Sequence, residues 1–102
     1  MFARKKDIRV RLTEARKRTE AALDAISRRR GGQVHLTSAA KVLTKRYDLR
    51  SVTDEQARLL LFAKLDELAT EAESDHREKR NRARIAILGF VMLLEKIAAE
   101  EL

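Results

Sequence analysis

The strongest structural signal in this chain is residues 53–72, TDEQARLLLFAKLDELATEA. Thr53, followed three positions later by Gln56, forms a capping box, which predicts that a helix begins here. Apolar residues then recur every three or four positions along the stretch. They form one broad face: Ala57, Leu60, Leu61, Phe62, Leu65, Leu68, Ala69 and Ala72. We therefore predict a helix that begins after Thr53, weakens near residues 74–76 and packs this face into a core.

A second C-terminal helix is predicted from about Asn81 or Ala83 to Glu100. Its first half holds the longest apolar run of the chain, residues 85–94, IAILGFVMLL. Ten residues are too few to span a membrane, which takes about 20. A helix that is apolar all round lies in a core or at a subunit interface. We therefore predict that it pairs with the 53–72 helix and meets a second copy or a larger complex. The predicted interface residues are Ile87, Phe90, Val91 and Leu94.

The N-terminal part of the chain is predicted to form one long basic helix over about residues 3–30. Apolar or small side chains follow each other there at steps of four and three, the spacing of a helical seam. The seam consists of Ile8, Leu12, Ala15, Thr19, Ala22 and Ile26. Gly31 and Gly32 are expected to end the helix. A short helix should follow from Ala39 to about Leu49, with Thr37 or Ser38 as its N-cap.

The composition favours helices over strands. The 102 residues include no Pro, no Cys and only three Gly. The chain therefore has few of the residues that tight β-hairpin turns require. Hydrophobic residues make up 44% of the chain, enough for a core, and the length is that of one domain. We predict an all-α fold: a single domain over 1–102, built as a small helical bundle. It should combine the basic helix at 3–30 with a helical core over about 37–100, and two helices should form its apolar centre.

The sequence offers few groups for catalysis. The absence of Cys excludes disulfides, thiolate metal sites and Cys nucleophiles together. His35 and His76 lie 41 positions apart in unlike surroundings, and Gly31-Gly32 has the spacing of no phosphate-binding loop. We therefore expect a non-enzymatic protein with no catalytic residues, no metal, no cofactor and no small-molecule substrate.

Charge is the one functional signal. Lys and Arg number 23 against 16 Asp and Glu, a net charge of +7. Residues 1–50 carry +10, residues 54–75 carry −5 and residues 77–84 carry +4. The basic residues fall into three clusters: Arg4, Lys5, Lys6, Arg9 and Arg11; Arg16, Lys17, Arg18, Arg28, Arg29 and Arg30; and Arg77, Lys79, Arg80, Arg82 and Arg84.

These clusters predict binding to a nucleic acid. Most of their members are arginines, whose planar guanidinium group can donate two hydrogen bonds to one phosphate. Clustered cations can also contact a single polyanion together. Only Phe2, Tyr47, Phe62 and Phe90 are aromatic. Because binding of single strands needs several exposed aromatic side chains, duplex DNA or structured RNA is the expected ligand. We predict a small DNA-binding regulator or accessory factor that contacts the phosphate backbone.

Three other interpretations stay open. The charges also suit a helical adaptor or small subunit of a larger complex, including a ribonucleoprotein, or an inhibitor that covers a nucleic-acid enzyme. The basic runs are equally typical of solvated helix faces. No apolar stretch follows the basic start, so we expect no secretory signal, no membrane association and a cytoplasmic location.

Residues 8–12, Ile-Arg-Val-Arg-Leu, followed by Thr13-Glu14, resemble the strand entry of ribbon-helix-helix DNA-binding proteins. The resemblance covers residues 8–47 and implies a strand at 8–12 with Arg9 and Arg11 toward the bases, followed by helices and a helical C-terminal extension. The helical seam explains Ile8 and Leu12 equally well, so strand and helix both stay open there. Separately, residues 52–55, the long helix after them and residues 82–85 resemble the central helix and following loop of histone folds.

Overall fold

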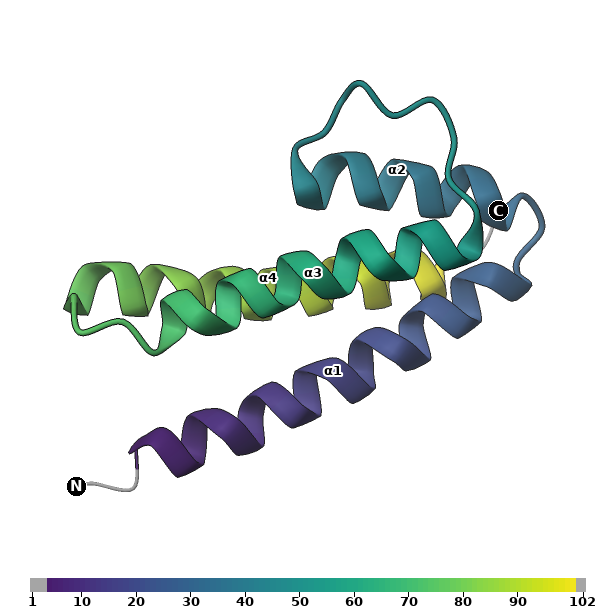
Figure 1. Cartoon of the computed structure of the whole chain (residues 1–102). Coiled ribbons are helices and arrows are strands. Elements are labelled where there is room, and N and C mark those ends of the chain that lie inside the picture. Colours follow the sequence, from purple (N-terminus) through teal and green to yellow (C-terminus); the bar gives the residue numbers. More distant parts are fainter. Residues whose placement is uncertain (1–3, 101–102) are drawn as a thin grey trace.

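The protein forms four helices, α1 (Arg4–Arg28), α2 (Gly32–Thr44), α3 (Asp54–Ala72) and α4 (Arg77–Ala99). The structure, a computed structural model, describes the backbone of residues 4–100 and the side chains of residues 11–100. Helices α1, α3 and α4 form an elongated bundle, and the shorter α2 lies over the half of α3 that follows Asp54 (Figure 1). The described residues contain no strand. The prediction of an all-α helical bundle is confirmed.

Helix α3 begins as its sequence predicts. The Thr53 hydroxyl accepts a hydrogen bond from the Gln56 backbone N–H at 3.1 Å, and the Gln56 side chain accepts one from the Thr53 N–H at 2.9 Å. This reciprocal pair satisfies two backbone donors that a helix start leaves without partners. The predicted capping box is confirmed.

Both resemblances are contradicted by the backbone. Residues 8–12 continue α1 as a helix, and no ribbon strand forms there. The reason lies in the spacing of the seam: Ala15, Thr19 and Ala22 share one face of α1, and all three are buried against the bundle. Residues 82–85 lie inside α4, so they do not form the loop that a histone fold would have after its central helix.

The prediction that Thr37 or Ser38 caps α2 is wrong, because the helix begins earlier in the chain. Gly31 takes a left-handed conformation with φ of 70°, which favours glycine, and α2 begins directly at Gly32. A Cβ atom on Gly32 would lie 2.7 Å from the Ile26 carbonyl oxygen, so this close approach to the end of α1 requires glycine. Thr37 is instead a buried residue inside the helix. Its hydroxyl donates to the Gln33 carbonyl and accepts from the Val52 N–H.

Two further helix boundaries differ from those predicted. Helix α2 ends at Thr44 and not near Leu49, because Lys45 adopts a left-handed conformation and its N–H bonds to the Lys41 carbonyl. Helix α4 begins at Arg77, several residues before Asn81 or Ala83. Arg, Glu and Lys are good helix formers, so the charged stretch extends the helix toward α3. The basic residues at 77–84 therefore lie on a helix and not in a turn.

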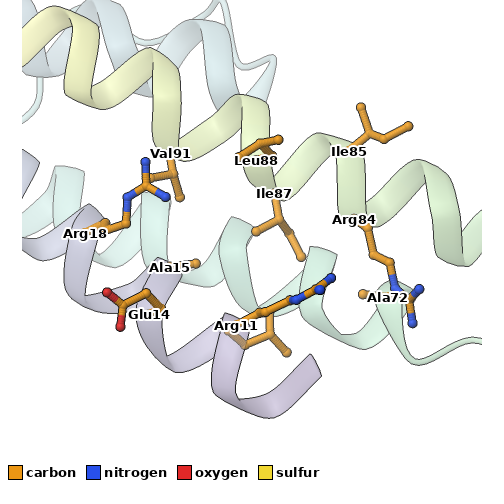
Figure 2. Close-up of a pocket in the computed structure, with 11 residues that line it drawn as sticks. Arg11, Glu14, Ala15, Arg18, Ala72, Arg84, Ile85, Ile87, Leu88 and Val91 are labelled. Atoms are coloured by element: carbon orange, nitrogen blue, oxygen red, sulfur yellow. The ribbon is translucent and has the colours of Figure 1, made fainter. Parts of the chain in front are cut away.

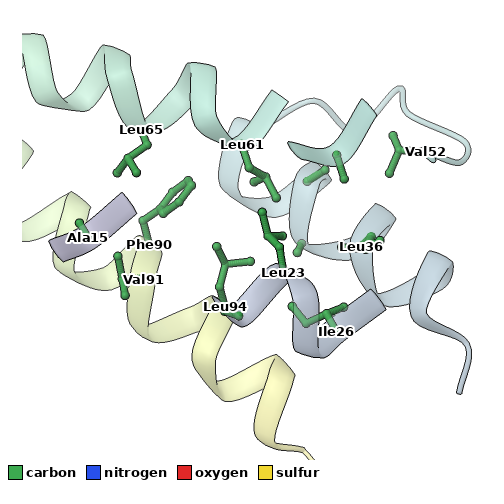
Figure 3. Close-up of a cluster of buried hydrophobic side chains, with 14 of the residues drawn as sticks. Ala15, Leu23, Ile26, Leu36, Val52, Leu61, Leu65, Phe90, Val91 and Leu94 are labelled. Atoms are coloured by element: carbon green, nitrogen blue, oxygen red, sulfur yellow. The ribbon is translucent and has the colours of Figure 1, made fainter. Parts of the chain in front are cut away.

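One apolar core joins all four helices (Figure 3). Leu23 and Ile26 of α1 belong to this core and are completely buried. The other three helices contribute side chains that are almost completely buried: Leu36, Leu61, Leu65, Phe90, Val91 and Leu94. The long basic helix therefore shares its core with residues 37–100. No helix in the described part of the chain is long and apolar enough to cross a membrane.

Candidate nucleic-acid interface

Several of the predicted ligand-binding arginines form ion pairs between helices of the bundle. The Arg16 guanidinium lies 2.5 Å from an Asp66 carboxylate oxygen and 5.0 Å from the centre of the Phe62 ring. Arg18 donates two hydrogen bonds to the Glu95 carboxylate, at 2.9 and 2.5 Å, and so joins α1 to α4. These two arginines join α1 to its neighbours in the bundle.

Two more predicted residues bind backbone carbonyls. Arg29 donates to the Ile97 carbonyl near the end of α4, and Arg80 donates to the Ser74 carbonyl at 3.3 Å. Arg58, which lies in none of the predicted clusters, pairs with both Asp24 and Asp54. Asp54 lies four residues before Arg58 on the same helix, whereas Asp24 lies 34 positions away. Local charge runs cannot reveal the pairing with Asp24, because the two partners lie far apart along the chain.

The Arg18–Glu95 pair makes the stability of the bundle depend on pH. The hydrogen bonds from Arg18 lower the pKa of Glu95 below its ordinary value. The unfolded chain therefore takes up this proton at a higher pH than the folded chain, and the stabilisation is complete only above the unfolded pKa of about 4.3. It declines as the pH falls through the lowered pKa of the folded state.

We expect Glu95→Gln to lower the melting temperature at neutral pH and to have a shrinking effect as the pH falls below about 4. Both proteins should be melted side by side from pH 7 to pH 3 and followed by circular dichroism. A difference in melting temperature that stays constant over this range would show that the ion pair contributes nothing to stability.

A groove of about 480 Å³ lies between the first half of α1 and the first half of α4 (Figure 2). Its walls are mostly apolar, with Leu12 on α1 and Ile87 and Val91 on α4. Arg11 and Arg84 also line it, and Figure 2 shows both guanidinium groups extending toward the same part of the groove. The Arg84 Nε is buried and has no hydrogen-bond partner among the described residues. Glu14 lines the groove as well, but neither Arg11 nor Arg84 forms an ion pair with a described side chain. The groove therefore combines an apolar wall with two arginines that have no ion-pair partner among the described residues.

The fold brings the first and third basic clusters to the same end of the bundle. The first turns of α1 and α4 lie at the same end of the molecule, whereas α1 finishes at the opposite end (Figure 1). At the shared end, residues 4–11 and 77–84 carry net charges of +4 each, and three acidic residues of 71–76 reduce the total to +5. Arg77, Lys79 and Arg82 are exposed there and form no ion pair with a described side chain.

The remaining predicted residues are separated from this end or lie outside the description. Arg28 and Arg30 are exposed, but 17 helical residues, about 25 Å, separate Arg28 from Arg11. Lys17 is exposed on α1 between them. Arg4, Lys5, Lys6 and Arg9 belong to the α1 backbone, and their side chains lie outside the described residues.

The predicted interface on α4 needs revision. Phe90, Val91 and Leu94 are buried in the chain's own core, and Ile87 packs against that core. The large apolar side chains that α4 exposes are Ile85, Leu88 and Met92. Because residues 85–94 are apolar on every side, their sequence does not indicate which face turns outward, so this exposed set was missed.

The other residues considered for chemistry remain scattered. His35 is half-buried in α2, and His76 is the exposed N-cap of α4. Within residues 11–100 no three His, Asp or Glu side chains gather in a way that could hold a metal ion. Phe90 is buried, Phe62 is half-buried and Tyr47 is exposed, while Phe2 lies outside the described residues.

The chain matches no known protein family, no curated protein and no solved structure.

Proposed function

We propose that this protein is a cytoplasmic, non-enzymatic nucleic-acid-binding protein that contacts the phosphate backbone with the end of the bundle where α1 and α4 begin. The observation that carries the proposal is that Arg11 and Arg84 line one groove and that neither forms an ion pair with a described side chain. Exposed cations on the first turns of α4 extend this basic surface.

The position of these cations on α4 supports the same function. The N-terminus of a helix carries a partial positive charge, so Lys and Arg side chains are unfavourable there and phosphate groups are favourable. Arg77, Lys79 and Arg80 nevertheless occupy the first turn, against the single acid Glu78. A phosphate bound at this end would offset the repulsion between these cations and the helix N-terminus.

The experiment is a binding assay with the full chain and two fluorescently labelled ligands, a DNA duplex and an RNA hairpin, at about 50 mM KCl. We expect at least one of them to bind, with an affinity that falls as salt is added. If both bind equally, recognition follows the backbone alone. The absence of binding to either ligand at this low salt concentration would contradict the proposal.

A second candidate function is that of a helical adaptor or small subunit that docks onto another protein. The observation that favours it is the exposure of Ile85, Leu88 and Met92 on one helix. Apolar side chains gathered on one exposed face are typical of protein interfaces. The failure of nucleic-acid binding would leave this function as the better supported one.

A further inference from the structure

Helix α4 exposes a continuous apolar stripe. Ile85, Leu88 and Met92 are 73%, 53% and 55% exposed, and their spacing of three and four residues places them on one face. Gly89 lies within the same stripe, and a Cβ atom built on it would meet nothing within 4 Å. A second helix could therefore approach the α4 backbone closely at its middle.

We propose that this stripe binds the same stripe of a second copy of the chain, with the two α4 helices antiparallel. The stripe is symmetric about the point between Leu88 and Gly89. In an antiparallel pair centred there, Ile85 lies at the same height as Met92 of the second copy, because both are three and a half residues from the centre. Leu88 and Gly89 meet their own counterparts near the twofold axis. This is the self-complementary contact that a twofold dimer requires.

The charges beside the stripe fit the antiparallel orientation. Glu78 and Lys96 are exposed, and neither forms an ion pair with a described side chain. In the antiparallel pair, the 3.6-residue period of the helix places Glu78 beside Lys96 of the second copy. The twofold axis repeats this contact. A parallel pair would instead set the basic first turns of the two helices against each other, which is unfavourable.

This dimer has a consequence for nucleic-acid binding, and this consequence alone rests on the proposed function. The two copies of Arg77 would lie 23 residues apart along the paired helices, about 35 Å. The twofold axis also turns both α1–α4 grooves toward the same side of the dimer. Dimeric DNA-binding proteins place their contacts about 34–36 Å apart, one turn of the duplex. The two basic ends would therefore match successive turns of one duplex.

Sedimentation of the full chain without nucleic acid tests the dimer independently of the proposed function. We expect a dimer at micromolar concentrations, and we expect Leu88→Asp to shift it to a monomer with unchanged helicity. The matched control is Leu59→Asp, because Leu59 is 67% exposed on α3 and lies outside the stripe. A monomeric unmodified chain, or equal loss of dimer in both variants, would overturn the proposal.

Disulfide cross-linking tests the orientation, and the chain has no native Cys to interfere. A mixture of I85C and M92C chains should form a mixed disulfide on oxidation. I85C alone should not, because the two copies of residue 85 would be about 10 Å apart along the helix axis, beyond the reach of a disulfide. Efficient cross-linking of I85C to itself would indicate a parallel pair and would contradict the antiparallel dimer.

Discussion

Leu61→Ala is expected to lower the free energy of unfolding by about 2–5 kcal/mol, the usual cost of emptying a leucine site in a packed core. Leu61 has no exposed surface and belongs to the cluster that joins all four helices. Truncation removes its contacts and leaves a cavity that the surrounding helices fill only in part. Urea unfolding followed by circular dichroism measures the loss.

Leu59→Ala is the matched control for this prediction. Leu59 lies two positions earlier on the same helix, but 67% of its surface is exposed. The same change of residue type should therefore alter stability by no more than about 0.5 kcal/mol. Equal losses in the two variants would contradict the packing of α3 described above.

The second large effect concerns the basic end of the bundle. The double substitution Arg11→Ala with Arg77→Ala is expected to weaken binding to a DNA duplex and to flatten its dependence on salt. Each lost phosphate contact reduces the slope of log K against log salt concentration by about 0.9, so two contacts should reduce it by about 1.8. Both arginines are exposed and form no ion pair with a described side chain, so the fold should survive the change.

Its matched control is Arg28→Ala with Arg30→Ala. These two arginines are also exposed and unpaired among the described side chains, and the net charge changes by the same amount. They lie at the other end of α1, so the slope should change little. If both double variants lose the same affinity, binding follows total charge and the basic end has no special role. Arg29 is left intact because it bonds to the Ile97 carbonyl.

The parts of the fold that could be predicted depend on interactions between neighbours in the sequence. The capping box needs only Thr53 and Gln56, and the apolar face of α3 follows from the period of the helix. The seam of α1 likewise indicated a helix at 8–12, although the alternation of Arg9, Val10 and Arg11 also matched a strand. Burial of Ala15, Thr19 and Ala22 on one face decides between the two.

The start of α2 could not be predicted in this way. Thr37 has the chemistry of an N-cap, but its hydroxyl is occupied by the Gln33 carbonyl and by the N–H of Val52, fifteen residues later. Gly32 begins the helix because it lies against the last carbonyls of α1. Both causes are contacts between separate elements, which local sequence patterns do not contain.

The candidate site shows the same limit. The charge runs indicated which residues are basic, but not which of them form ion pairs with neighbouring helices. Arg18 and Glu95 are 77 positions apart, and only the packing of α1 on α4 brings them together. The same packing brings Arg11 and Arg84 into one groove. For α4, residues 85–94 are apolar at almost every position, so their sequence does not indicate which face of the helix is exposed. Only the folded structure shows that Ile85, Leu88 and Met92 form the exposed stripe.

The most direct test of the central claim is a salt titration of the intact chain on a DNA duplex of about two helical turns, followed by fluorescence anisotropy between about 50 and about 200 mM KCl. The basic end offers Arg11, Arg77, Lys79, Arg82 and Arg84 in each chain. If these residues contact phosphates, log K should fall linearly with log salt concentration, with a slope of about −4.5 or steeper. A slope near zero, or no binding at the lowest salt concentration, would contradict the claim that this protein binds the nucleic-acid backbone.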